Sequence, residues 1–145
     1  MNNDLTRAKE ILEEKQFSFV LIREGRVIKT SYQKGVIPWI EVIREDDHLL
    51  EKAIIADRVM GRAAALLAVH YQVKALYAEI ISIRARELLD SNSLFYQFNQ
   101  SVDYIKNRAN NGPCPLEELT QSISNSSRAY GQILQFYRNL LKIDI

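Results

Sequence analysis

The sequence predicts an α/β domain in which a mixed central sheet is covered by helices. Three features favour this class: a hairpin pattern near the N-terminus, later strand patterns that alternate with helices, and amphipathic helical patterns at both ends of the chain. Hydrophobic residues make up 47% of the chain and charged residues 26%, which is ordinary for a folded globular protein. The 145 residues suit one domain, 1–145, with a core at about 5–119 and a closing helix at about 126–143.

The first third of the chain predicts a helix, a hairpin and a second helix. Apolar residues at helical spacing follow Asp4, a residue suited to cap a helix. Two stretches rich in β-branched and aromatic residues are then separated by Glu24-Gly25, a turn signal because glycine tolerates positive φ. Gly35 and Pro38 precede the next helix. We expect these elements at about 4–15, 17–23, 26–31 and 39–44.

The middle of the chain predicts a central helix followed by alternating strands and helices. AIIADRVMGRAAALLAVH is the most apolar segment, and we interpret it as a short extended stretch followed by a helix. Small residues lie along one side of that helix, where they allow close approach to a sheet: Gly61, Ala64, Ala65 and Ala68. We expect an extended stretch at 53–56, a helix at 57–70, a strand at 74–82, a helix at 84–90 and a strand at 94–98.

Composition and charge exclude several classes of protein. Nineteen basic and eighteen acidic side chains give a formal charge of +1, which argues against a dedicated nucleic-acid binder. The single cysteine excludes an intrachain disulfide. The N-terminus lacks an apolar signal core, and no run approaches the roughly 20 apolar residues that cross a bilayer. We therefore expect a cytoplasmic protein with neither nucleic acid nor membrane as its partner.

Glu79 is the first candidate functional residue. It lies inside KALYAEII, which is apolar on both faces and therefore typical of a central strand covered on both sides. A carboxylate at such a place is costly unless it is paired, hydrogen-bonded or next to a cleft. Two interpretations stay open: an ion pair with an arginine that fastens the strand to a helix, or a general acid or base with a raised pKa.

Arg58 and Arg62 are the second candidate feature. They are one turn apart on the predicted helix and would share one face of it. Cations in the opening turns of a helix are mildly unfavourable, because the helix dipole is already positive there. Since surface arginines usually need no special ligand, the more common compensation is an acidic neighbour: Asp57, Glu79 or the patch Glu45-Asp46-Asp47. The alternative is an anionic ligand, a phosphate or carboxylate, held by both guanidinium groups.

Cys114 is the third candidate, in the stretch NNGPCPLEEL. Pro115 suits the first position of a helix, and Glu117 and Glu118 suit its first turn. Cys114 would then be the N-cap residue, where amide dipoles lower the pKa of a thiol, whereas the adjacent glutamates raise it. A reactive thiol and a buried structural residue therefore both stay open.

The sequence lacks the motifs of common cofactor-dependent classes. His48 and His70 are the only histidines, and with one cysteine they give no His/Cys zinc site. No Walker loop, GxGxxG or GxSxG motif occurs. We predict neither a metal ion nor another cofactor.

Several stretches together resemble an uncharacterised prokaryotic family, a domain of unknown function. They are LTRAKEILEEKQFSFVLIREGRVIKTS, GVIPWIEVI, ADRVMGRAAALLAV, YAEIIS and YIKNRANNGPCPLEEL. The resemblance covers about 5–119, and its most specific pieces are ADRVMGRAAALL and the pattern NR…G.CP.E.L. It implies a cytidine deaminase-like fold, a three-layer α/β/α domain with a mixed central sheet.

The chain departs from a zinc deaminase at the metal-binding positions. In such an enzyme an H-x-E or C-x-E signature opens the central helix, and P-C-x-x-C opens the next one. Here Ala56-Asp57-Arg58 and the stretch Ser82 to Arg86 stand at those places, and neither holds a zinc ligand. The family pattern favours lysine where this chain has Arg58 and Arg62. This keeps the positive charge but removes any chemistry that needs a lysine amine.

The resemblance also implies that residues on its motif segments line one cleft at strand ends, where open α/β sheets bind ligands. The candidate catalytic residues are Cys114, Glu79 and Asp57, and the candidate ligand-binding residues are Arg58, Arg62, Ser82 and Glu117. In these roles the thiol would be a nucleophile or contact group, the carboxylates an acid or base, and the guanidinium groups an anion clamp.

Two functions follow, and the sequence leaves both open. The first is a zinc-independent, deaminase-like protein that binds or transforms a small anionic or nucleotide-like ligand. The second is a non-catalytic binding or regulatory module with a degenerate deaminase-type cleft. Folds of this kind often assemble, so Trp39, Tyr130 and Tyr137 are candidates for the contact of a homo-oligomer, although single aromatic residues more often belong to the core.

Overall fold

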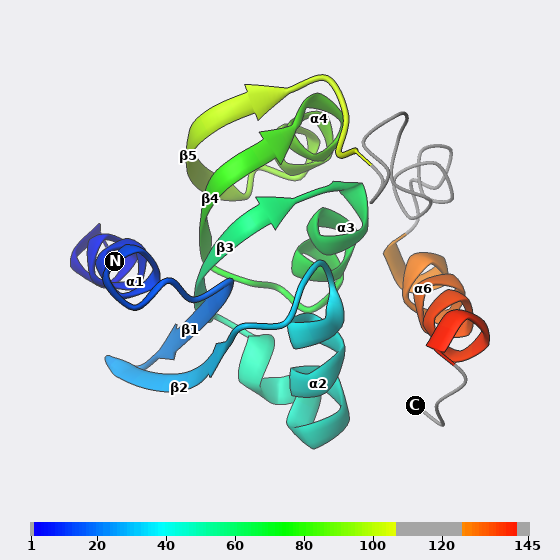
Figure 1. Ribbon diagram of the computed structural model, residues 1–145, viewed down its shortest axis with the longest axis horizontal. Coiled ribbons are helices and arrows are strands. Elements are labelled where there is room, and N and C mark those ends of the chain that lie inside the picture. Colours follow the sequence, from blue (N-terminus) through cyan, green and yellow to red (C-terminus); the bar gives the residue numbers. More distant parts are fainter. Residues whose placement is uncertain (1, 107–125, 142–145) are drawn as a thin grey trace.

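The structure is a computed structural model, and it describes residues 2–106 and 126–141. Its strands are β1 (Phe19–Arg23), β2 (Arg26–Ser31), β3 (Ile54–Met60), β4 (Ala75–Ser82) and β5 (Phe95–Val102). They form one five-stranded sheet in the order β2-β1-β3-β4-β5 (Figure 1). β1 is antiparallel to both β2 and β3, whereas β3, β4 and β5 are parallel. The predicted α/β class and mixed sheet are therefore confirmed.

Helices cover both faces of this sheet (Figure 1). One face carries α1 (Asn2–Lys15), and the other carries α2 (Ile37–Asp46), α3 (Arg62–His70) and α4 (Ile83–Ser91). A short 3-10 helix, η1 (Asp47–Leu50), joins α2 to β3, and α6 (Ser126–Leu141) packs against α3. None of the helices in the described segments has the length and hydrophobicity of a membrane span.

The central strands place their side chains alternately in two cores. Leu21 and Ile55 join the larger core under α2, α3 and α4, whereas Val20 and Ile54 join the smaller core under α1. In the larger core the Trp39 ring of α2 packs edge-on against Phe19, with ring centroids 5.6 Å apart. Because both faces are covered, these strands are almost continuously apolar.

The predicted hairpin is confirmed, and its turn explains the choice of residues. Glu24 and Gly25 have φ angles of 53° and 77°. Positive φ at both central residues is the requirement of a type I′ turn, whose twist matches that of the flanking strands. Arg23 and Arg26 are paired directly beside this turn.

The prediction for the middle of the chain is wrong in one respect. The sequence predicts a helix over 57–70, but β3 continues to Met60 and α3 begins at Arg62. Asp57 pairs with Ala78 and Met60 with Ile81 in the ladder between β3 and β4. A strand with neighbours on both sides gains ladder hydrogen bonds and side-chain packing that outweigh local helix propensity. The extended stretch expected at 53–56 is therefore the first part of a central strand.

Gly61 separates this strand from the helix. Its backbone is extended, with φ −102° and ψ −174°, and α3 begins at the next residue. Of the small residues predicted along one side of this helix, Ala64, Ala65 and Ala68 are buried in α3 together with Leu66 and Leu67, whereas the glycine precedes the helix.

Ala68→Leu is expected to destabilise the protein, because a larger side chain has no room in this close-packed core. We expect a loss of about 1–3 kcal/mol in the free energy of unfolding. Urea unfolding measures this change. Glu87→Leu on the exposed side of α4 is the control and should change stability by only about 0.5 kcal/mol. Equal midpoints for Ala68→Leu and the wild type would contradict the close packing of α3.

Candidate functional site

The carboxyl ends of β3 and β4 lie side by side, because these strands are parallel neighbours. α3 begins after Gly61 and α4 begins after Ser82, so two helix N-termini meet there. We call this region, Met60 to Arg62 with Ser82 to Arg84, the carboxyl edge. Ser82 is buried, and its hydroxyl accepts a hydrogen bond from the Ala85 amide at 3.1 Å. Open α/β sheets bind ligands at such edges, where the helix dipoles are positive.

Two arginines add positive charge to the carboxyl edge. Arg62 is the first residue of α3, and its Nη1 lies 3.4 Å from the Arg84 carbonyl oxygen, to which it donates. Arg84 lies in the first turn of α4, and its own Nη1 is shielded from solvent and has no hydrogen-bond partner among the described residues. A buried donor left without a partner costs about 1–3 kcal/mol. A guanidinium group near a helix N-terminus is also unfavourable. A bound anion would offset both costs.

Asp57 is a buried carboxyl group on the face covered by α2, α3 and α4. It is 3% exposed, and Trp39 Nε1 donates to its Oδ2 at 3.0 Å. Burial raises the pKa of Asp57 to about 7, and hydrogen bonds from Trp39 and from the Val59 and Arg58 amides only partly oppose that rise. The group therefore titrates near neutrality, in contact with α2 rather than with solvent.

Arg58 faces the opposite side of the sheet and fastens α1 to β3. Its Nη2 donates to the Leu12 carbonyl at 3.0 Å and to the Phe17 carbonyl at 2.6 Å, and its Nε donates to Phe17 at 3.1 Å. Leu12 lies in the last turn of α1, where carbonyl oxygens lack helical partners and a cation is favourable. The prediction that Arg58 and Arg62 share a helical face is therefore wrong, because only Arg62 is on the helix.

Glu79 lies on the same side of the sheet as α1. The Tyr77 hydroxyl donates to its Oε2 at 2.9 Å, and Asn99 Nδ2 donates to its Oε1 at 3.0 Å. Burial, together with the hydrogen bond to Glu79, raises the pKa of Tyr77 above its ordinary value. Among the described residues, the hydrogen-bond partners of Glu79 are thus neutral side chains of β4 and β5. The predicted ion pair with an arginine is not seen there.

The structure divides the predicted site residues into two groups. Arg58 and Glu79 face α1, whereas Asp57, Arg62 and Ser82 lie at the carboxyl edge or on the face under the other helices. Cys114 and Glu117 lie outside the described residues, so their roles stay predictions. Of the predicted residues that the structure describes, Arg62 and Ser82 are therefore the two that meet at the expected strand ends.

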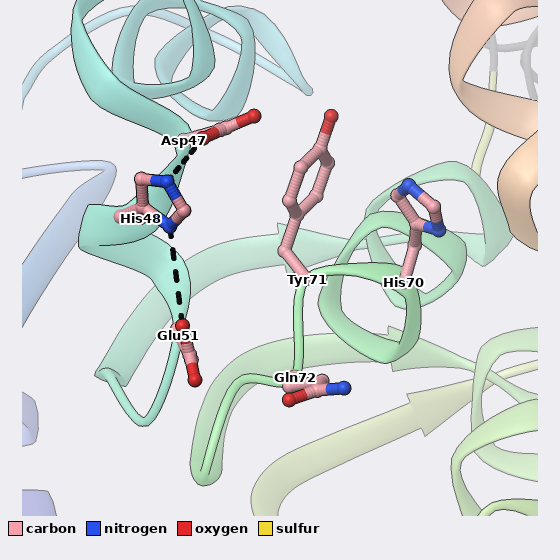
Figure 2. A pocket seen from close by; sticks show the side chains of 6 residues that line it. All are labelled: Asp47, His48, Glu51, His70, Tyr71 and Gln72. Atoms are coloured by element: carbon pink, nitrogen blue, oxygen red, sulfur yellow. Dashed lines mark ion pairs between the residues drawn. The ribbon is translucent and has the colours of Figure 1, made fainter.

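A hollow lies at the opposite edge of the sheet, near the first residues of β3 and β4 (Figure 2). Its volume is about 210 Å³, and both histidines of the chain line it. Figure 2 shows His48 between the carboxylates of Asp47 and Glu51, with Tyr71 and His70 on the other side. His48 Nε2 is 3.9 Å from Asp47 Oδ1, and its Nδ1 is 4.0 Å from Glu51 Oε2. The sequence does not predict this hollow, because the two histidines are far apart and share no motif.

The hollow is acidic and aromatic in character. Burial, followed by the neighbouring Tyr130 and Asp47, raises the pKa of Tyr71 to about 12. Within the described segments, one group of side chains has its ligand atoms close enough to share a metal ion, within 4.8 Å: Asp46, Asp47 and His48. All three are exposed, and exposed acidic groups are common without a metal. We therefore assign no metal ion to this hollow.

Comparisons with known proteins reveal a family without an assigned activity. The family model of a domain of unknown function, DUF1893, matches residues 7–137. The crystal structure of the DUF1893 family protein TM1506 from Thermotoga maritima is similar, with a TM-score of 0.85 and 24% sequence identity. The similarity covers 93% of this chain and 90% of that one, and at this identity it shows a shared fold alone. No curated protein matches the sequence.

Asp57→Asn is expected to remove a pH dependence from the stability. The folded pKa of about 7 lies above the ordinary value of 3.8, so the folded state holds the proton more tightly. The free energy of unfolding should therefore fall as pH rises from about 4 to about 7, by roughly 4 kcal/mol if only this group titrated.

Urea unfolding of the wild type and the variant at about pH 5 and about pH 8 measures this contribution. Asp47→Asn, which neutralises an exposed carboxylate, is the control and should keep the pH dependence of the wild type. The same fall in stability for Asp57→Asn and the wild type would show that another group is responsible.

Arg58→Met is expected to loosen α1. The variant leaves the Leu12 and Phe17 carbonyls without a charged donor, at a cost of about 2–3 kcal/mol. Hydrogen exchange should show faster exchange of the α1 amides, whereas Arg44→Met at an exposed site of α2 should leave them unchanged. Unchanged α1 protection in Arg58→Met would contradict this role.

Proposed function

The chain belongs to the DUF1893 family, a domain of unknown function, and from this premise we propose that it is a zinc-independent, deaminase-like protein that binds a small anionic or nucleotide-like ligand at its carboxyl edge. The order of its elements supports the deaminase-like part. A hairpin is followed by two parallel strands, β3 and β4, and each of these leads directly into a helix. Zinc deaminases carry their metal ligands where two such helices begin.

The residues that open these two helices favour an anion over a zinc ion. α3 opens with Gly61-Arg62-Ala63, and α4 opens with Ser82 to Arg84. α3 begins later than the sequence predicts. The residues that open it still include no histidine, cysteine or carboxylate that could bind zinc. Arginine at a helix start instead suits phosphate or carboxylate groups, which accept hydrogen bonds from guanidinium and backbone N–H groups together.

The unpartnered Nη1 of Arg84 is the observation that carries this proposal. This nitrogen is buried, and the guanidinium of Arg62 reaches the backbone of the same residue. An anion that accepted from Arg84 Nη1 would satisfy the donor and balance the charge. It would also lie next to the positive ends of α3 and α4.

The positions of the carboxylates favour binding over catalysis. Asp57 is enclosed against Trp39, and Glu79 is on the opposite face of the sheet, so neither extends into the carboxyl edge. An acid–base step there would need groups outside the described residues, of which Cys114 and Glu117 are the predicted ones. Of the two functions, the described residues therefore favour the non-catalytic one, in which the carboxyl edge binds an anion without transforming it.

Calorimetric titration with inorganic phosphate and with a nucleoside monophosphate tests the proposal. Arg84→Met removes the buried donor but keeps most of the side-chain volume. We expect it to weaken binding about tenfold or more, since a hydrogen bond to a charged group contributes about 1.5–3 kcal/mol. Arg44→Met removes one positive charge from an exposed site of α2 and should leave the affinity unchanged.

Three results would overturn the proposal. The first is that neither anion binds the wild type. The second is that both arginine variants weaken binding equally, because this would indicate unspecific electrostatic attraction. One equivalent of zinc in the purified protein, measured by elemental analysis, would refute the zinc-independent part. Tighter binding of the nucleotide than of phosphate would extend the site beyond the anion itself.

A further inference from the structure

The two outer strands of the sheet differ in how they are protected from other strands. β2 carries Arg26 and Lys29, and a register shift opposite Leu21 and Ile22 interrupts its pairing with β1. β5 has the sequence FYQFNQSV, without a charged residue, and pairs with β4 along its length with no register shift. Edge strands are usually protected from pairing with other chains by charges, bulges or a covering element. β2 has two of these protections, whereas β5 has neither a charge nor a bulge.

Among the described residues, no element covers the outer side of β5. It has β4 as its neighbour in the sheet, and Figure 1 shows no described helix or strand beyond it. Phe95 and Phe98 are 42% and 38% exposed. Arg86 packs against the face of β5 that lies towards α4. Its guanidinium lies 4.5 Å from the Phe98 ring and donates to the Ser101 hydroxyl at 3.0 Å. These contacts fix the strand and leave its outer backbone groups unpaired by any described strand.

We infer that β5 pairs with β5 of a second copy of this chain, so that two five-stranded sheets join into one continuous sheet. Antiparallel pairing around a two-fold axis would place identical edges against each other. A neutral strand meets itself without like-charge repulsion, whereas self-pairing of β2 would bring the cations Arg26 and Lys29 of two copies onto one shared seam. β5 is eight residues long, and an identical strand could pair with it over the same length.

The same features argue for a second copy over a foreign strand. A specific foreign partner is usually selected by complementary charges or by pockets for its side chains. β5 has no charged side chain, and its outward positions are mainly exposed aromatic and amide groups. An identical strand satisfies the exposed N–H and C=O groups without needing either kind of selection. The inference is independent of the anion site, which is formed by β3, β4, α3 and α4.

Sedimentation equilibrium of the full chain tests this interface. The wild type should be a dimer that dissociates on dilution. Gln97→Lys/Gln100→Lys adds charges at two exposed positions of β5 and should give a monomer with unchanged circular dichroism. Asn3→Lys/Gln33→Lys adds the same charge at exposed positions far from β5 and should remain dimeric.

Mixing variants of opposite charge separates strand pairing from misfolding. Gln97→Glu/Gln100→Glu should also be monomeric alone, whereas an equal mixture with the double lysine variant should form a heterodimer. The inference is overturned if the wild type is monomeric at every concentration, or if the lysine variant dimerises as well as the wild type. It is also overturned if the two charged variants fail to associate when mixed.

Discussion

The parallel pairing of β3 with β4 is the constraint on which the rest of the structure depends. Parallel neighbours need a crossover, and α3 supplies it on the face opposite α1. Because the strands run the same way, α3 and α4 begin at one edge of the sheet. The loops around Lys52 and Gln72 meet at the other edge, where the Lys52 amide donates to the Gln72 carbonyl at 2.9 Å. The carboxyl edge and the hollow of Figure 2 therefore lie at the two ends of one βαβ unit.

Two adjacent residues of β3 fasten helices to both faces of the sheet. Asp57 accepts from Trp39 of α2, and Arg58 donates to the end of α1. The two groups meet the cost of burial in different ways. The carboxyl group shifts its pKa towards neutrality, so that part of it is protonated near pH 7, whereas the guanidinium donates hydrogen bonds to backbone carbonyls. Strand alternation makes both contacts available from consecutive residues.

Elements with one clear local signal could be predicted from the sequence, and elements that depend on tertiary pairing could not. The hairpin has Glu24-Gly25, and β4 is a clear apolar run. ADRVMGRAAALLAV instead fits a buried strand or a buried helix equally well, because an apolar segment without periodicity does not distinguish them. Ser82 was predicted from its place at a strand end, whereas Arg62 was predicted from a helical face shared with Arg58, which the structure does not form. Arg84 was not predicted, because the burial of its Nη1 without a hydrogen-bond partner among the described residues has no signature in the sequence.

Two carboxylates of the central strands are held away from the proposed anion site. A carboxylate beside Arg62 and Arg84 would cancel the field that the helix dipoles and guanidinium groups create. Glu79 is kept on the opposite face by Tyr77 and Asn99. Asp57 is closer in sequence to this edge, but burial leaves it only partly ionised near neutral pH. Burial of Asp57 therefore reduces the negative charge that this residue would place near the proposed anion site.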